Sequence, residues 1–141
     1  MKKLEYFYNY AEKEKISVLN ASLDELKGFF YTVDNKNYIF LNYNKIKNVV
    51  EEKCILAEEC GHYSVGAIPL NIYSNDYNNK IINSKNEFRA FKWALDKLIP
   101  YDKFKSFLEK DLTKFEVANE LEVTEEFLEK AYKYYTSIDL T

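Results

Sequence analysis

Hydrophobic residues along the chain follow two spacings, one typical of helices and one typical of strands. Near the N-terminus Leu4, Phe7 and Ala11 recur every three or four residues with Lys and Glu between them, which indicates an amphipathic helix. The aromatic, β-branched runs FFYTV (29–33) and NYIFLNY (37–43) flank Asp-Asn-Lys and predict a β-hairpin. The expected elements are a helix over 2–14, a strand over 16–20, a short helix over 22–28, the hairpin, a helix from 44 or 45 to about 63, a helix over 84–98, and short helices over 101–109, 113–121 and 124–136.

Two of these helix starts depend on a capping box, in which a Ser or Thr is followed three residues later by Glu. Ser22 with Glu25 predicts the short helix over 22–28, and Ser84 with Glu87 predicts the start of the helix over 84–98. Between the longer helices, residues 64–80 have no such pattern and are expected to form a long loop. A loop of this length is unusual in a compact domain and is often functional.

Residues 114–135 have the pattern of a helix-turn-helix, with Thr113 and Thr124 as the expected caps of its two helices. That helix carries Glu125, Glu126 and Glu129, whose charges oppose a phosphate backbone. A structural or partner-binding role is therefore favoured over the reading of DNA.

Composition narrows the class of protein. The chain has 141 residues, of which 47% are hydrophobic and 17% aromatic, as expected of one folded domain. The formal net charge of −3 gives no electrostatic reason for a nucleic acid or an anionic membrane as partner. No apolar run approaches the roughly 20 residues of a membrane helix, and the N-terminus lacks the apolar segment of a signal peptide.

The two cysteines agree with a reducing compartment. Cys54 and Cys60 fall on one expected helix, where their Cα atoms would be about 9 Å apart, too far for a disulfide. We expect both to be small buried hydrophobes and the protein to be cytoplasmic.

The stretch ILAEECGHYSVG (55–66) carries the candidate chemistry. Metal-dependent peptide hydrolysis needs protein ligands, an open position for water and a base. Glu58 and His62 stand at i and i+4, so both side chains can reach one ion. Glu59 is rotated by about 100° from Glu58, as the base is in His-Glu-x-x-His. The first histidine of His-Glu-x-x-His is replaced here by Glu58, and His62 is the sole histidine of the chain. The stretch is therefore either a metal site with a substituted ligand or a helix that only resembles one.

A third ligand would come from a second helix. Glu87 shares a helical face with Ala90 and Ala94, whose small side chains would let that helix pack close to the motif. The alternative is that Glu87 only completes the capping box of Ser84. A site this rich in carboxylates accepts zinc, and manganese or iron(II) compete better there than at an all-imidazole site.

These stretches resemble the ImmA/IrrE family of small metallopeptidases, which are encoded largely by phages and mobile elements. Family members typically show Leu-Ala-His-Glu-Leu-Gly-His, and a substantial subset shows Leu-Ala-Glu-Glu-Leu-Gly-His-Tyr. LAEECGHY matches that subset except at Cys60, where Leu is usual. The downstream positions that fit the family pattern are Glu87, Ala90, Trp93, Ala94, Ile99 and Pro100. The resemblance covers roughly residues 15–136.

The resemblance implies that His62 and Glu87 bind zinc and that Glu59 is the catalytic base, with Glu58 at the remaining ligand position. It also implies the cleavage or inactivation of helix-turn-helix repressors as the activity. Tyr63, next to the site, is a candidate contact to the substrate or the transition state. The alternative is a catalytically silent relative that binds and sequesters a repressor or another partner protein through the same groove.

We therefore expect an α+β fold in which a small antiparallel β-sheet packs on the metal-site helix, a minimal zincin-like core, with additional C-terminal helices. The expected organisation is a single metallopeptidase-like domain over 1–141. It consists of a core over 1–100, which contains the metal-site helix 45–63, and a C-terminal helical part over 101–136.

Overall fold

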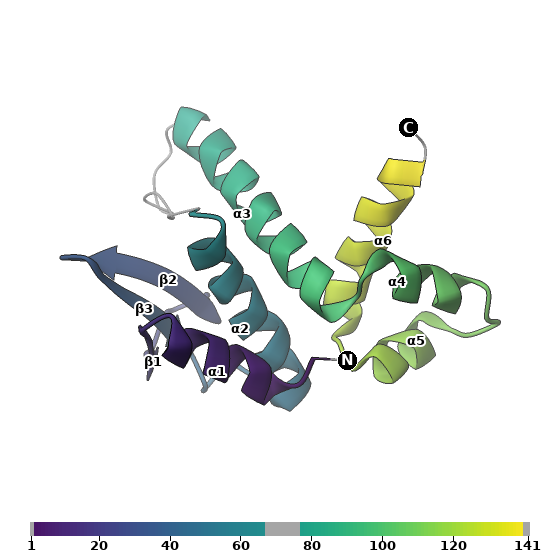
Figure 1. Cartoon of the computed structure of the whole chain (residues 1–141), viewed down its shortest axis with the longest axis horizontal. Coiled ribbons are helices and arrows are strands. Elements are labelled where there is room, and N and C mark those ends of the chain that lie inside the picture. The colour runs from purple at the N-terminus through teal and green to yellow at the C-terminus, as the bar shows by residue number, and fades with distance from the viewer. Residues whose placement is uncertain (1, 67–76, 140–141) are drawn as a thin grey trace.

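The computed structural model of the protein describes residues 2–66 and 77–139, and in them a small sheet lies beside a group of helices (Figure 1). The elements are α1 (Leu4–Lys13), β1 (Ile16–Asn20), β2 (Gly28–Val33), β3 (Lys36–Leu41), α2 (Val49–Ser64), α3 (Tyr77–Leu98), α4 (Tyr101–Leu108), α5 (Lys114–Leu121) and α6 (Glu125–Asp139). The expected α+β class is confirmed.

The sheet has the order β1-β3-β2. The expected hairpin is confirmed: β2 and β3 pair antiparallel, with Phe30 opposite Ile39. Asp34 and Asn35 form its two-residue turn, with φ values of 51° and 60°. Two residues at positive φ make a turn whose twist matches that of the strands, and Asp and Asn tolerate this backbone. β1 adds to β3 in parallel, so the sheet is mixed and only its hairpin is antiparallel.

The predicted helix over 22–28 is wrong. Its residues form a turn in which the Leu26 N–H donates to the Leu23 carbonyl, and Gly28 opens β2 opposite Leu41. The glycine is there because of close packing rather than as a helix stop: a Cβ on Gly28 would lie 2.6 Å from Cγ2 of Ile55. A capping signature with so few residues after it cannot compete with strand pairing.

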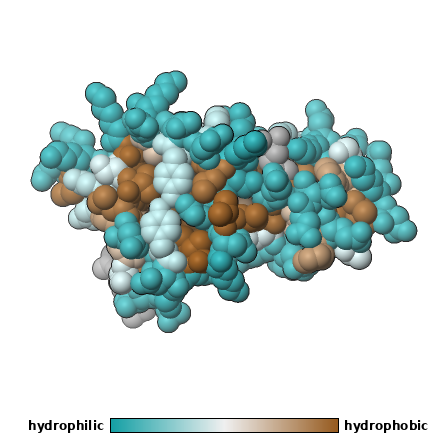
Figure 2. Space-filling view, turned by 90° about the horizontal axis from the view of Figure 1, so that it is seen from below, coloured by the Kyte–Doolittle hydropathy of each residue, from teal (hydrophilic) through white to brown (hydrophobic). Residues whose placement is uncertain are grey.

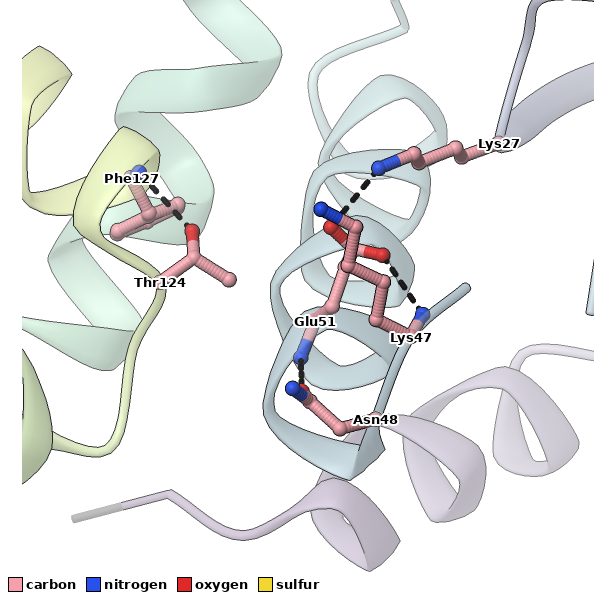
Figure 3. A network of polar contacts seen from close by, with 6 residues as sticks. All are labelled: Lys27, Lys47, Asn48, Glu51, Thr124 and Phe127. Carbon is pink, nitrogen blue, oxygen red and sulfur yellow. Dashed lines mark hydrogen bonds and ion pairs between the residues drawn. The ribbon is translucent and has the colours of Figure 1, made fainter. Parts of the chain in front are cut away.

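α2 begins at Val49, several residues later than predicted, because Asn48 is its N-cap (Figure 3). The Asn48 side chain accepts a hydrogen bond from the Glu51 backbone N–H at 2.9 Å. Glu51 in turn accepts from the Lys47 backbone N–H and pairs with Lys27 Nζ, both at 2.9 Å. These bonds satisfy the first turn of the helix and tie it to the segment before β2.

The predicted cap at Ser84 is also wrong, because α3 begins at Tyr77 and Ser84 lies inside it. The helix therefore includes 77–80, which were assigned to the loop; the part of that loop over 67–76 lies outside the described residues. Asn and Tyr have modest helix propensity, so the sequence pattern did not reveal the added turns. The predicted end of this helix at Leu98, before Pro100, is confirmed.

The three short C-terminal helices are confirmed. Thr113 caps α5 in a capping box with Glu116. Thr124 caps α6, its Oγ1 accepting from the Phe127 backbone N–H at 3.0 Å (Figure 3). The Tyr135 hydroxyl donates to the Ile99 carbonyl at 2.7 Å and ties α6 to the end of α3.

α2 lies at the centre of the fold, between the sheet with α1 on one side and α3 on the other (Figure 1). Its apolar residues join the core of the molecule. Fully buried core side chains include Phe7, Ile39, Leu41, Leu56, Cys60, Leu95, Leu98, Ile99 and Leu121. Seen from below, the surface shows hydrophobic residues in a band across its middle, with hydrophilic residues around the rim (Figure 2). No helix in the described ranges is long and apolar enough to span a membrane.

Candidate active site

The motif residues stand on one continuous helix, as the spacing predicts. α2 runs without a break from Val49 to Ser64, so Glu58 and His62 are one turn apart on the same face. His62 is almost fully buried at 2% exposure, whereas the Glu58 side chain is 22% exposed. This pair therefore faces the boundary between the core and the surface.

α3 brings Glu87 to His62. The Nε2 atom of His62 lies 3.1 Å from Oε1 of Glu87, and the Glu87 side chain is 63% exposed. A hydrogen bond from His62 lowers the pKa of Glu87, so that carboxylate stays ionised. Since Ser84 is not a helix cap, Glu87 has no reciprocal capping role, and its partner is the histidine of the motif.

Gly61 allows this contact. A Cβ at Gly61 would lie 2.4 Å from the carbonyl oxygen of Ala90, a distance that no side chain could occupy. The small residues Ala90 and Ala94 are fully buried on the facing side of α3. Gly61 therefore lets the backbone of α3 come close to α2, and this close approach puts Glu87 beside the motif.

Glu59 lies against the start of β2. A Cβ on Gly28 would stand 3.2 Å from Oε2 of Glu59, so the glycine leaves the room that this carboxylate occupies. Burial raises the pKa of Glu59 to about 8; His62 opposes the increase, and the charges of Glu87 and Glu58 add to it. A carboxyl that titrates near neutral pH can both accept and return a proton.

Glu58 contacts a residue that the sequence analysis did not identify. Its Oε1 lies 3.3 Å from Nζ of Lys130 on α6. Burial raises the pKa of Glu58, and the charge of Lys130 opposes that increase. Lys130 is distant along the chain and follows the acidic run EEFLE, so no local spacing connects it to the motif.

Three carboxylates, those of Glu58, Glu59 and Glu87, come from the motif and the facing helix, and the Lys130 ammonium contacts one of them. Their negative charges repel one another, and a divalent cation would offset that charge. One imidazole with carboxylates is a donor set that zinc, manganese and iron(II) accept. Within residues 2–66 and 77–139 no three His, Cys, Asp or Glu side chains converge as a metal-binding group. The donor types fit a metal, with Glu58 turned to Lys130.

A cavity of about 320 Å³ opens beside the site. Its wall includes Gly28, Ile55, Glu58, Glu59, Phe127 and Lys130. The cavity therefore lies between the start of β2, α2 and α6, and both motif carboxylates line it.

Tyr63 lies on the α1 side of α2. Its hydroxyl donates to Oε1 of Glu14 at 3.4 Å, and its ring packs edge-on against Tyr10 and Phe30. The role of Tyr63 as a contact to the substrate stays a prediction.

The two cysteines are free and buried, as expected. Burial raises the pKa of Cys54 to about 11 and that of Cys60 to about 12. Both thiols therefore stay protonated at neutral pH and act as small apolar side chains. They are not suited to bind a metal, because the ligand form of cysteine is the thiolate.

A small mixed sheet lies on a helix that carries Glu-Glu-x-Gly-His, and the next helix supplies a glutamate to that motif, which is the arrangement expected of a metallopeptidase. The profile of the M78 peptidases, described as the IrrE N-terminal-like domain, matches residues 11–133, and the chain belongs to this family. The resemblance to ImmA/IrrE proteins is thereby confirmed. Membership implies a metal cofactor and a protein substrate. No curated protein and no solved structure matches the chain.

Proposed function

We propose that this chain is a metal-dependent endopeptidase of the cytoplasm that cleaves a helix-turn-helix repressor of a phage or mobile element. The observation that supports it most is the position of Glu59, whose carboxyl lies against Gly28 at the wall of the cavity, where burial raises its pKa. Such a group suits proton transfer at neutral pH.

Glu58, His62 and Glu87 are the proposed ligands of the metal, with zinc as the first choice and manganese or iron(II) as alternatives. A bound divalent cation supplies a Lewis acid that polarises the scissile carbonyl and lowers the pKa of water. For Glu58 to contribute, its carboxylate must leave Lys130.

Glu59 has the central role in the proton transfers. It accepts the proton of the attacking water and then delivers it to the amine of the leaving peptide. Its place beside Gly28 and the Phe30 backbone fixes the carboxyl against the start of β2. The neighbouring cavity, with Ile55 and Phe127 in its wall, receives an apolar side chain of the substrate.

A second candidate is a silent relative that binds and sequesters the repressor. It is favoured by the contact of Glu58 with Lys130, which satisfies the carboxylate without a metal. The retained Glu59 argues against it, because a binding protein has no use for a buried base at this position.

The test is cleavage of a candidate repressor encoded near the gene by untagged protein, compared with Glu59→Gln. The amide keeps the size of the side chain but cannot accept the proton of water, so cleavage should fall by about 10²-fold or more with the metal content unchanged. Glu120→Gln, an exposed position on α5, is the matched control and should cleave normally.

Cleavage that survives in Glu59→Gln would remove Glu59 as the base. If the wild-type protein forms a stable complex with the repressor and never cleaves it, the silent binder is the correct function.

A further inference from the structure

Lys130 contacts both of the helices that carry the candidate ligands. Its Nζ lies 3.3 Å from Oε1 of Glu58 on α2, and 4.6 Å from the ring centre of Phe91 on α3. The Lys130 side chain is 45% exposed. The ammonium therefore reaches from the surface to a half-buried carboxylate, with a cation–π contact along the way.

The start of α6 fixes where this side chain stands. Thr124 caps the helix through the Phe127 backbone N–H (Figure 3), and the Phe127 ring packs 5.0 Å from that of Phe91. Lys130 follows Phe127 by about one turn, so it projects from the same region of α6. The Glu58 contact therefore results from the packing of α6 on α3.

Lys130 also lies in the wall shared by two cavities. One, of about 320 Å³, includes Glu58 and Glu59 in its wall. The other, of about 400 Å³, includes Glu87 and Lys133. Lys130 thus shares one cavity wall with Glu58 and another with Glu87, and its charge acts on both carboxylates.

We propose that Lys130 determines the metal affinity of the site, because its ammonium is an internal cation that a divalent ion must displace from Glu58. The inference rests on the proposed metal site and makes it more specific. An ammonium close to a ligand carboxylate lowers the negative potential that attracts a cation, and it holds one oxygen in a hydrogen bond. The divalent ion prevails through its greater charge, at the cost of breaking that pair.

Lys130→Met tests this directly. Methionine keeps an unbranched apolar stem against Phe91 but has no charge. Dissociation constants for Zn²⁺ and Mn²⁺ should fall by about tenfold in the full chain stripped of metal, measured by calorimetric titration. Lys130→Arg keeps the charge and should stay within about threefold of wild type. Lys133→Met, in the wall of the same Glu87-side cavity, is the matched control and should not change affinity.

A double variant shows whether Glu58 mediates the effect. In a Glu58→Gln background, Lys130→Met should tighten metal binding much less than it does in wild type, since the ammonium has no ligand carboxylate to occupy and acts on Glu87 only through its charge. If Lys130→Met fails to fold, Lys130→Gln is measured in its place.

The outcomes separate this inference from the proposed function. Unchanged or weaker binding in folded Lys130→Met, with wild type binding one ion through His62, overturns the role of Lys130 alone. If neither wild type nor folded Lys130→Met binds Zn²⁺ or Mn²⁺, the metal site itself is wrong and this inference fails with it.

Discussion

His62 and Glu87 are in contact, with Nε2 of the imidazole 3.1 Å from Oε1 of the carboxylate. The two residues come from α2 and α3, which approach so closely only because Gly61 has no side chain facing the carbonyl of Ala90. The contact brings together the Glu-Glu-x-Gly-His motif on α2 and the downstream family motif on α3 that begins with Glu87. It is also the pair whose loss should be easiest to detect by metal analysis.

His62→Ala should remove the bound divalent ion, because the chain has no second imidazole to replace the ligand. Glu87→Gln should weaken metal binding by about tenfold or more with little effect on folding, since its side chain is largely exposed. Metal per chain by mass spectrometry checks both. Asp96→Asn, exposed on the same helix, should keep the wild-type metal content. One ion per chain in His62→Ala would mean that the site is assigned wrongly.

Glu58→His should shift the preference of the site toward zinc. Imidazole ligates as a neutral, softer nitrogen donor, so the site loses one negative charge and favours zinc over manganese. The substitution also removes the acceptor that Lys130 contacts. Competition titration of wild type and variant with the two ions measures the ratio of affinities. A ratio that stays the same would exclude Glu58 as a ligand.

Gly61→Ala should destabilise the fold by about 2 kcal/mol or more, because its Cβ meets a backbone oxygen and the two helices must separate. Metal affinity should fall with it, as Glu87 moves from His62. Gly66→Ala is the control: its Cβ would meet no atom within 4 Å, and only the positive φ of 67° opposes it, at about 1 kcal/mol. Urea unfolding gives both free energies. Equal losses in the two variants would contradict the close approach of α2 and α3.

The stability of the chelator-treated protein should fall as pH rises from 5 to 8. The folded pKa of Glu59, about 8, lies above its usual value of 4.5, so the protonated form favours the folded state. That stabilisation is complete below pH 4.5 and is lost as the pH passes through 8. Between pH 5 and pH 8 the free energy of unfolding should therefore fall by on the order of 3 kcal/mol. Urea unfolding at several pH values measures it. Glu59→Gln should show a flatter profile, and an equally steep one would assign the dependence to other groups.

Local chemistry explains what the sequence predicted correctly. Asp34 and Asn35 tolerate positive φ, so these two residues were enough to predict the hairpin turn. Thr113 and Thr124 accept bonds that their own helices leave open, so both caps were found. The face shared by Glu58 and His62 follows from helix geometry alone.

The errors came where distant segments decide the outcome. The parallel addition of β1 to β3 depends on a partner far along the chain, and Gly28 is set by its packing on Ile55 of another element. Lys130 reaches Glu58 only because α6 packs on α3. Residue spacing and helix or strand propensity within a short stretch of sequence cannot predict such long-range contacts.

The atom that faces Gly61 is a main-chain carbonyl, and every amino acid carries one. A second substitution at position 90 therefore cannot make room for a side chain at position 61, whatever residue it introduces. Core positions that conflict through side chains can be exchanged in pairs, one shrinking as the other grows. Position 61 has no such partner, so in directed evolution from Gly61→Ala the activity should return through reversion to glycine or through changes that move the whole of α3.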